Sequence, residues 1–391
     1  MKKKIILSAL LGATTSLMAL GAEYSYLYKD ARIMGMGGAN VAVGGYSSSV
    51  FSNPAGLVSI KKESGYVVDI LGIGASASAG FLDFSNDISD ANTDAEMTEV
   101  LQNYAGEHFH AGVNNYTAVS KNGDAFAWSV GLLSAADINF QAHPNGSTNG
   151  GLLAITSRVY GGVVLGGAKE IQTNAGKVDI GVGLKYISQQ SVEGSLGISE
   201  LVNSDDVLQT LQDKYQKTSS GFGVDLGVVY HPFAKSSLHP AFGLSVLNIG
   251  AIGMDDNFGK QPTTVNLGAS ISPEVAFLEK FVVAVDYVDM LNANTIRIYD
   301  YSGNGDTVSY SDYSDNDFMK RLRLGMGIGL IDSTWFSAQV NLGLYQSAYT
   351  AGLDMEIAVI KLNISTYEEQ IGTGSVDIPD RRYMAQIGIG W

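Results

Sequence analysis

The sequence has no cysteine, and only 7 of its 391 residues are proline. Without cysteine the chain forms no disulfide, and it offers no thiolate as a nucleophile or metal ligand. Basic residues are also scarce, with 24 Lys and Arg against 39 Asp and Glu and a formal net charge of −15. A surface this acidic repels nucleic acid and anionic substrates, so we expect no nucleic-acid partner.

Long apolar runs are missing everywhere except at the start of the chain. Three lysines follow Met1, the run from Ile5 to Leu20 is mostly apolar, and a small pair ends at Ala22. This order is typical of a secretory signal peptide, so we expect residues 1–22 to be removed after export, with Ala19 as a second candidate cleavage point. Beyond it no stretch of about 18 apolar residues recurs, which argues against membrane-spanning helices.

The sequence is instead rich in glycine, with 47 residues, and in tyrosine, with 20. Its closing segment places Tyr383, Ile387 and Trp391 on one face of a strand and Gln386 and Gly388 on the other. An outward apolar row bounded by aromatic residues is typical of the wall of a transmembrane barrel. An amphipathic edge strand of a soluble sheet is the alternative interpretation.

Alternating segments recur along the chain and predict an all-β fold, a transmembrane antiparallel β-barrel of about 14 strands over residues 63–391. Counts of twelve or sixteen are also compatible with the pattern. The expected strands are Glu63–Ala75, Asn114–Lys121, Asp124–Ala135, Ile155–Glu170, Lys177–Gln189, Ser219–Pro232, Leu238–Asn248, Thr263–Ser272, Lys280–Leu291, Met319–Leu330, Thr334–Tyr345, Ala348–Glu356, Val359–Tyr367 and Arg381–Trp391.

The connections between these strands alternate in length. Short turns at 121–124, 173–176 and 331–333 all fall on one side of the expected wall, and the first contains an Asn-Gly pair that favours a tight hairpin. The long connections fall on the other side, at 76–112, 136–153, 190–218 and 292–318. Outer-membrane barrels have short periplasmic turns and longer external loops, whereas a soluble sandwich has no reason to sort its loops in this way.

Each expected strand places apolar side chains on one face and glycine and charged residues on the other. An Arg or Asp facing lipid near the midplane would cost about 2 to 4 kcal/mol, so the charged row must face the lumen. The lumenal polar residues predicted in this way are Asp179, Lys185, Asp225, Asp286 and Arg323. The glycines that accompany them leave room inside the barrel.

The segment before the first strand, residues 23–62, carries a distinctive set of short motifs. These are Ala31-Arg32, the run from Met34 to Ala39, the run from Val41 to Val43, and Asn53-Pro54-Ala55-Gly56-Leu57. The segment resembles the N-terminal plug of the FadL-type hydrophobic-compound transporters and of related fourteen-stranded families. A nucleotide-binding loop is disfavoured because no parallel-sheet unit surrounds the glycines.

The resemblance implies a plug inside the lumen and assigns it gating residues, namely Arg32, Gly35, Gly37, Gly38, Asn53, Pro54 and Ala55. Glycine permits positive φ and close approach of the backbone. If Arg32 is buried it needs an acidic partner, for which Asp179, Asp225 and Asp286 are the candidates. In the FadL family the ligand leaves sideways at a kinked third strand, where this chain has only Gly131 as an obvious flexible point.

The C-terminal part resembles the TraF-like branch of these families, whose name comes from plasmid transfer. The similarity lies in Arg321-Leu322-Arg323-Leu324-Gly325, in Thr350-Ala351-Gly352-Leu353 and in the segment from Pro379 to Arg382. The closing segment also resembles that of bacterial outer-membrane proteins, in which a terminal aromatic is read by the barrel-assembly machinery. Trp391 would be that assembly signal here.

No catalytic motif stands out, and we expect neither an enzyme nor a cofactor. His108 and His110 lie beside Glu107 in an expected loop, but exposed loop histidines seldom bind metal, so we expect no metal site. An acidic loop at 312–317 lacks the spacing of a calcium loop.

Two of the long connections have helical periodicity, over 94–104 and 205–215. Packing of each apolar face on the barrel rim is the simpler interpretation. The functional interpretation is an external vestibule that captures an apolar ligand. The residues concerned are Met97, Val100, Leu101, Tyr104, Val207, Leu208, Leu211 and Tyr215.

Together these features predict an integral protein of the bacterial outer membrane, surrounded by lipid. The resemblance implies a channel for hydrophobic small molecules of fatty-acid or aromatic-hydrocarbon type, gated by the plug. The alternative is a non-transporting assembly or docking protein of a secretion or conjugal-transfer system, with protein partners. A general water-filled porin is a third candidate, which a tight plug disfavours.

Overall fold

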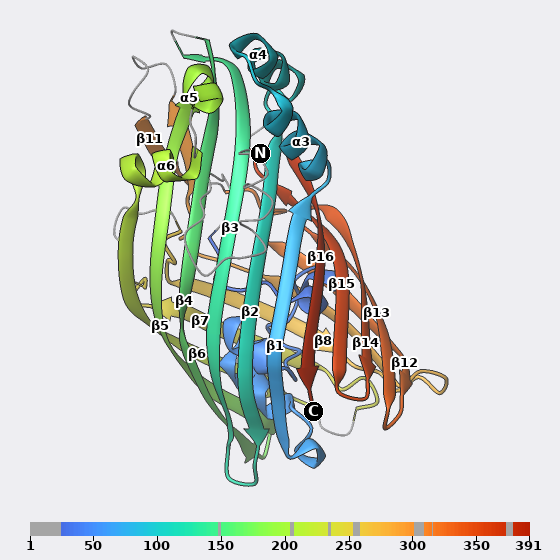
Figure 1. Cartoon of the computed structure of the whole chain (residues 1–391). Helices are drawn as coiled ribbons and strands as arrows, with labels where there is room; N and C mark the ends of the chain where they lie inside the picture. The colour runs from blue at the N-terminus through green and yellow to red at the C-terminus, as the bar shows by residue number, and fades with distance from the viewer. Residues whose placement is uncertain are drawn as a thin grey trace.

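A closed barrel of fourteen antiparallel strands forms the body of the protein (Figure 1). The computed structural model describes residues 25–147, 150–203, 207–233, 236–252, 259–300, 309–314, 316–372 and 378–391. The strand count and the antiparallel pairing agree with the prediction, and the first strand begins at Tyr66 rather than at residue 63. The expected signal peptide lies outside the described residues.

Consecutive barrel strands are neighbours, and β1 closes the ring against β16. The strands are β1 (Tyr66–Ser78), β2 (His108–Asn122), β3 (Ala127–Ser147), β4 (Gly150–Thr173), β5 (Gly176–Gly197), β6 (Lys217–His231), β7 (Ala241–Ile249), β8 (Thr264–Ile271), β9 (Lys280–Tyr287), β12 (Leu322–Asp332), β13 (Phe336–Tyr345), β14 (Ala348–Ile357), β15 (Ile360–Gln370) and β16 (Pro379–Gly390). A separate hairpin of β10 (Ile296–Asp300) and β11 (Ser309–Tyr313) lies in the connection between β9 and β12.

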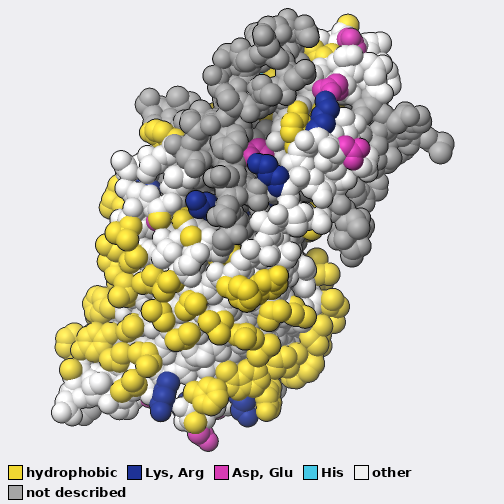
Figure 2. Space-filling model, turned by 90° about the vertical axis from the view of Figure 1, so that its left-hand side faces the viewer, with side chains coloured by type: hydrophobic (Ala, Val, Ile, Leu, Met, Phe, Trp, Pro, Cys, Tyr) yellow, Lys and Arg dark blue, Asp and Glu magenta, His cyan; other side chains and the backbone are white. Residues whose placement is uncertain are grey.

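An apolar belt surrounds one part of the outer wall. Along β5 the side chains from Ile180 to Tyr186 alternate between exposed apolar residues and buried ones, and beyond them the exposed positions become Ser188 and Gln190. Figure 2 shows the same belt as a zone of hydrophobic side chains over the lower part of the molecule. Because a period of two places alternate residues on opposite faces, one strand supplies both the belt and the lumen lining.

The two ends of the barrel differ. At one end, here called the turn end, short turns join β2 to β3, β4 to β5 and β12 to β13. At the opposite end, the helical end, strands β3 to β5 continue well past the belt, with lengths of 21, 24 and 22 residues. About 9 to 11 residues suffice to cross a bilayer, so roughly half of each strand extends beyond it. The expected loop at 136–153 is therefore wrong, because most of it is strand.

Four helices cover the helical end: α3 (Phe81–Asp90), α4 (Asp94–Asn103), α5 (Ile198–Asn203) and α6 (Val207–Tyr215). Helices α4 and α6 were expected from their periodicity, whereas α3 and α5 were not. A capping box between Thr93 and Glu96 starts α4. Among the residues described, we find no helix with the length and apolar character needed to traverse a bilayer.

The depth of the belt can be tested on β5. We expect Val182→Arg, in the middle of the exposed apolar row, to lower the free energy of unfolding by about 2 to 4 kcal/mol. Ser188→Arg lies on the same face beyond the row and should cost no more than about 1 kcal/mol. Urea titrations of the protein folded into lipid vesicles measure both values. Equal costs at the two positions would contradict the assignment of the belt.

Candidate functional site

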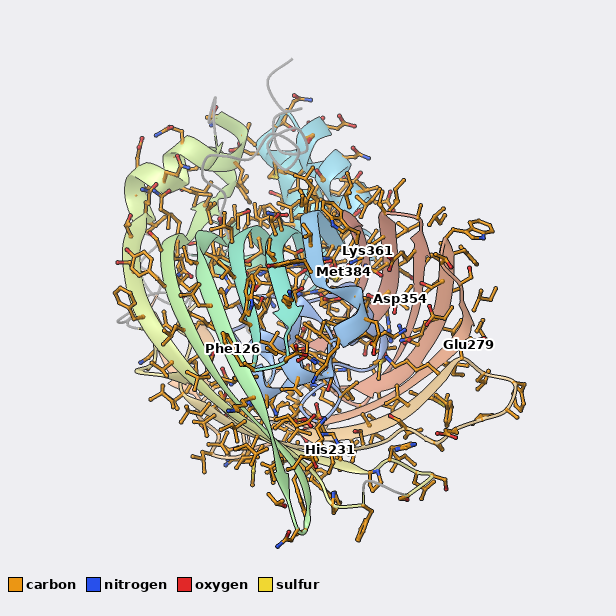
Figure 3. The ribbon with its side chains drawn as sticks, turned by 90° about the horizontal axis from the view of Figure 1, so that it is seen from below. Phe126, His231, Glu279, Asp354, Lys361 and Met384 are labelled. Carbon is orange, nitrogen blue, oxygen red and sulfur yellow. The ribbon has the colours of Figure 1, made fainter. Side chains whose placement is uncertain are left out.

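The N-terminal segment lies inside the barrel, at the level of the apolar belt. Figure 3 looks along the barrel from the turn end and shows its short helices within the ring of strands. We call the described part of this segment, residues 25–62, the plug. It contains the α-helix α2 (Ala31–Gly35) and the 3-10 helices η1 (Ser47–Phe51) and η2 (Pro54–Ser59), and a third one, η3 (Lys62–Ser64), leads into β1.

A belt of glycines on the inner wall receives the plug. A Cβ atom added at any of these glycines would lie less than 3.0 Å from a plug atom. They belong to eight different strands, namely Gly166 of β4, Gly181 of β5, Gly227 of β6, Gly243 of β7, Gly268 of β8, Gly325 of β12, Gly343 of β13 and Gly352 of β14. Real Cβ atoms do not approach other atoms so closely, so the plug fits only because these positions have no side chain.

Three of the predicted gating residues, Gly35, Gly37 and Gly38, lie in the plug and contact the wall. Gly35 packs against Gly352, and the Thr350 hydroxyl accepts a hydrogen bond from the Gly37 N–H at 3.0 Å and donates one to the Gly35 carbonyl at 2.8 Å. Gly37 and Gly38 have φ of 65° and 78°, a region that favours glycine. Gly38 also lies beside the ring of Tyr345. The plug backbone is thus held directly by the wall.

The Asn53-Pro54-Ala55 motif forms a second contact with the wall. The Asn53 side chain caps η2 by accepting the Ala55 N–H at 3.0 Å, and Pro54 takes the first helical position, where its missing N–H costs nothing. The Asn53 amide nitrogen donates to the carbonyls of Val41 at 2.7 Å and Val228 at 3.2 Å. One fully buried amide therefore joins two parts of the plug to β6.

Asp286 supplies the contact on β9, where the glycine belt is interrupted. Its carboxylate accepts the backbone N–H groups of Asn40 at 2.6 Å and Val41 at 2.8 Å. Both bonds end on one oxygen, Oδ2, so a single acceptor holds two consecutive backbone N–H groups of the plug. This predicted lumenal carboxylate therefore clamps the plug.

Arg32 pairs with a carboxylate of its own helix. Its guanidinium donates to Asp30 at 2.7 and 3.0 Å and lies over the ring of Tyr46 at 4.4 Å. The expectation that Asp179, Asp225 or Asp286 would be its partner is wrong, because the guanidinium bonds the N-cap residue of α2, two positions away in the sequence.

Asp30 is buried, and burial by itself raises the pKa of a carboxyl group. The Arg32 guanidinium, the Ser48 hydroxyl and the Arg32 N–H outweigh that effect and hold the pKa of Asp30 below its ordinary value. Asp30 is therefore charged at neutral pH, and the pair stays ionic inside the plug.

The other predicted lumenal residues face inward and are buried, as expected. Asp179 accepts a hydrogen bond from His231 at 2.9 Å, and Lys185 forms an ion pair with Asp225 at 2.9 Å. Arg323 lies on β12 close to the plug and packs on Tyr345, with its guanidinium carbon 3.9 Å from the ring centre. These residues form separate pairs rather than one network.

A cavity of about 240 Å³ lies between the plug and the helical end of the barrel. Plug residues between 25 and 52 form much of its wall, and the remainder comes from the middle of β5, from the helical ends of β7, β8, β12 and β13 and from the segments next to them. Apolar side chains such as Ile33, Phe51 and Leu247 alternate with charged ones such as Lys185 and Arg323. Sequence reasoning did not identify this cavity, because its residues come from distant parts of the chain.

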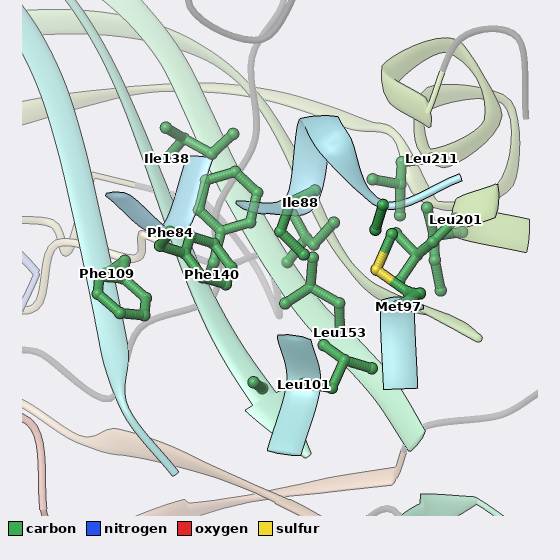
Figure 4. Packing of buried hydrophobic residues seen from close by; sticks show 14 of the residues in the cluster. Phe84, Ile88, Met97, Leu101, Phe109, Ile138, Phe140, Leu153, Leu201 and Leu211 are labelled. Atoms are coloured by element: carbon green, nitrogen blue, oxygen red, sulfur yellow. The ribbon is translucent and has the colours of Figure 1, made fainter. Parts of the chain in front are cut away.

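The predicted external capture residues lie in a buried hydrophobic cluster rather than on an open surface (Figure 4). Met97, Leu101 and Leu211 are at most 1% exposed and pack with residues of β2 to β5, with Val100, Tyr104 and Tyr215 partly buried around them. The side chains of Val207 and Leu208 lie outside the described set. The packing interpretation therefore describes these helices, and a role in ligand capture stays a prediction.

The structure also corrects the expected weak point of the wall. Strand β3 is regular around Gly131, whose inner side is filled by the Tyr116 ring. One irregularity lies in β1, where Ile70 and Ile73 pair with Ile389 and Ile387, so that β1 has one extra residue. Other register shifts occur between β3 and β4, between β6 and β7 and between β12 and β13. Leu71 at the bulge in β1 has φ of 53°. Such a bulge bends the strand and interrupts its ladder.

His108 and His110, expected in a loop, are buried in β2. His108 bonds Asp380 at 3.0 Å, and His110 bonds Asn139 at 2.6 Å and Ser76 at 3.0 Å. Among the described residues no group of three His, Asp or Glu side chains is arranged to hold a metal ion. In the acidic loop at 312–317, the side chains of residues 312 and 315 lie outside the described set. Trp391 is exposed at the turn end and pairs through its backbone with Val68 of β1.

A sequence-family comparison decides the family. The model described as "F plasmid transfer operon, TraF, protein" matches residues 50–249, just over half of the 391 residues. The chain belongs to the TraF family. The match covers the second half of the plug and strands β1 to β7. No curated protein sequence matches the chain.

Solved structures share the fold of this TraF-family protein at low sequence identity. The Ralstonia pickettii toluene transporter TbuX has 13% identity and a TM-score of 0.53, with 93% of this chain and 98% of TbuX covered. The Pseudomonas putida toluene transporter TodX has 13% identity and a TM-score of 0.50 over 94% and 98% of the two chains. The CymD monoaromatic hydrocarbon channel has 13% identity and a TM-score of 0.50 over 95% and 97%.

The fit of the TraF-family plug on its glycine belt gives one prediction. Gly227→Ala places a Cβ atom against the Asn53 side chain, so we expect the plug to be displaced from the wall and the barrel to conduct ions. Gly167→Ala is the matched control, because a Cβ there has nothing within 4 Å. Conductance in planar bilayers measures the difference. A closed barrel in the Gly227 variant would contradict the role of the belt.

The Asp30–Arg32 pair gives a second prediction. Arg32→Ala leaves a buried carboxylate without its cation, and we expect a loss of about 3 kcal/mol in unfolding free energy at pH 7. Because the pKa of Asp30 is lower in the folded protein than its unfolded value of about 4, ionised Asp30 stabilises the fold at pH values above about 4. This stabilisation disappears as the pH falls through the pKa of Asp30 in the folded protein. The difference between variant and wild type should therefore shrink below about pH 4. Urea titrations at several pH values test this, and a difference that does not change with pH would contradict it.

Proposed function

We propose that this protein is a channel of the bacterial outer membrane that admits hydrophobic small molecules and is gated by its plug. In this proposal the helical end faces outward and the turn end faces the periplasm. The exposed apolar belt supports the membrane location, because a soluble protein rarely exposes so large a continuous apolar surface. The proposal includes export by a cleaved signal peptide, assembly by the barrel-assembly machinery and a surrounding of outer-membrane lipid.

The observation that carries the proposal is a plug seated below a cavity. The plug meets the wall across the glycine belt, and its polar contacts with the wall include the Asn53 amide, Asp286 and Thr350. Each hydrogen bond of this kind contributes about 1 to 3 kcal/mol, so a small shift can exchange it for another. A ligand that enters the cavity touches plug residues such as Ile33 and Met34 directly. Binding and plug movement are coupled by this contact.

The ligand class follows from the cavity and from the fold. Leu27, Phe51 and Leu247 give part of the cavity an apolar wall, which suits a hydrophobic molecule. Two of the proteins with this fold are described as toluene transporters and another as a monoaromatic hydrocarbon channel. We propose a ligand of fatty-acid or aromatic-hydrocarbon type, and a role as a channel rather than an enzyme.

The family description favours one alternative, a docking or assembly protein of a conjugal-transfer system. In that case the plug would be a permanent part of the barrel, and the protein would carry stoichiometric protein partners. The two functions differ in whether the plug must move.

An engineered disulfide between plug and wall tests the gate. The Ser245 hydroxyl of β7 donates to the plug carbonyl of Ser52 at 2.7 Å, so these two residues are in direct contact. Because the chain has no cysteine, Ser52→Cys with Ser245→Cys introduces the only two thiols. We expect the oxidised double variant to take up labelled toluene into proteoliposomes much more slowly than its reduced form. Dithiothreitol should restore the rate.

The two single variants are the controls, since neither can form the bond. Mass spectrometry after oxidation verifies the disulfide by the loss of two hydrogen atoms from the double variant. Uptake that is unchanged by a verified disulfide would overturn the gating role of the plug. Absence of uptake in the wild type, together with a co-purifying partner, would favour the docking protein.

A further inference from the structure

We propose that the cavity above the plug binds a carboxylate attached to a single aromatic ring, with Arg323 as the residue that recognises the carboxylate. The inference deepens the proposed function, on which it rests, by naming the substrate class. It distinguishes a ring-sized anion from a neutral hydrocarbon and from a long-chain fatty acid.

Arg323 is a buried cation without a carboxylate partner in the described part of the chain. Its side chain lines the cavity and is 5% exposed. One terminal nitrogen donates to the carbonyls of Lys320 at 2.7 Å and Leu322 at 3.1 Å, and the guanidinium packs on Tyr345. Asp286 is its cross-strand neighbour, but no ion pair joins the two side chains, and the Asp286 Oδ2 atom accepts two backbone N–H groups of the plug. A buried charge is costly unless it is paired.

The other charged groups around the cavity already have partners. Lys29 pairs with Glu369, Lys185 pairs with Asp225, and Asp30 pairs with Arg32. Arg321 and Asp289 lie 3.9 Å apart and neutralise each other. Arg323 is therefore the residue whose charge a ligand can balance. Guanidinium has a planar fork that matches both oxygens of a carboxylate.

The remaining wall suits a ring. Tyr26, Tyr28 and Phe51 come from the plug, and the rings of Tyr28 and Phe51 lie 5.1 Å apart. Tyr345 adds a fourth aromatic next to Arg323. Aromatic faces arranged in this way pack well against a further ring.

The volume sets the size of the ligand. An apolar cavity of about 150 Å³ holds one benzene molecule. The present cavity, about 240 Å³, holds one ring with a short acidic substituent. The flexible tail of a long-chain fatty acid exceeds this space.

The protein as a whole has a formal net charge of −15, the same sign as the proposed ligand. Composition alone therefore predicted that anionic substrates would be repelled. The cavity differs from the surface because its carboxylates are already neutralised by neighbouring cations. Local pairing therefore decides the electrostatics of the site, since it acts over a few ångströms in a poorly solvated space.

Binding of phenylacetate and phenylacetamide to the purified protein tests the inference. The two molecules have almost the same shape and differ in charge. We expect wild-type protein in detergent to bind phenylacetate at least about tenfold more tightly, because a charge-assisted hydrogen bond to a buried guanidinium is lost with the amide. Arg323→Gln should abolish this preference, and Arg323→Lys should retain part of it. Isothermal titration calorimetry measures the affinities.

Lys217→Gln removes an exposed cation at the helical end and should leave the preference unchanged. Heat-dependent mobility on gels verifies that each variant is a folded barrel, and the comparison of the two ligands on wild type needs no variant. Equal affinities on wild type, a preference that survives in Arg323→Gln, or tighter binding of decanoate than of phenylacetate would each overturn the inference. Toluene uptake that responds to the plug disulfide in a protein that shows no such preference would leave the proposed function intact.

Discussion

The close approach between the barrel wall and the plug backbone is the constraint on which the rest of the structure depends. At eight strands a glycine stands where any larger residue would displace the plug. The glycines occupy the inward positions of strands whose outward positions form the apolar belt, as Gly181 does between Ile180 and Val182. One alternation therefore specifies both the surface that meets lipid and the surface that holds the plug, because the side-chain period of a strand is two.

A lumen this tightly filled leaves little water to solvate charge, so buried ions must be paired within the protein. Asp30 with Arg32 and Lys185 with Asp225 follow that rule. Asp286 meets it differently, by accepting two backbone N–H groups of the plug. The plug is thus held by hydrogen bonds and shape, and also by a buried apolar cluster that joins plug residues such as Val50 and Leu57 to wall residues such as Val164. This arrangement can be both tight and reversible, since each polar contact is individually modest.

Much of the fold could be predicted from the sequence, because strands that cross a membrane carry the strongest pattern that a β-protein has. All fourteen barrel strands were identified, along with the inward orientation of Asp179, Lys185, Asp225, Asp286 and Arg323. The predictions failed where lipid no longer imposes that pattern. Residues 136–153 were expected to form a loop, but most of them continue β3 and β4 beyond the belt, where helices rather than lipid cover outward apolar residues such as Ile138 and Phe140.

Within the lumen, the sequence by itself determined which residues face inward and that a glycine-rich segment precedes the barrel. Only the tertiary structure decided how these residues pair: Arg32 with Asp30, Asp286 with the plug backbone, and Arg323 with a cavity. It also placed the bulge in β1 rather than at Gly131. The physical reason is that the direction in which a side chain points, inward or outward, depends on local alternation along one strand. Pairing depends on distances in three dimensions. Alternation does not give these distances, whether the partners are neighbours in sequence, as Arg32 and Asp30 are, or lie in distant segments that only the closed barrel brings together, as Asn40 and Asp286 do.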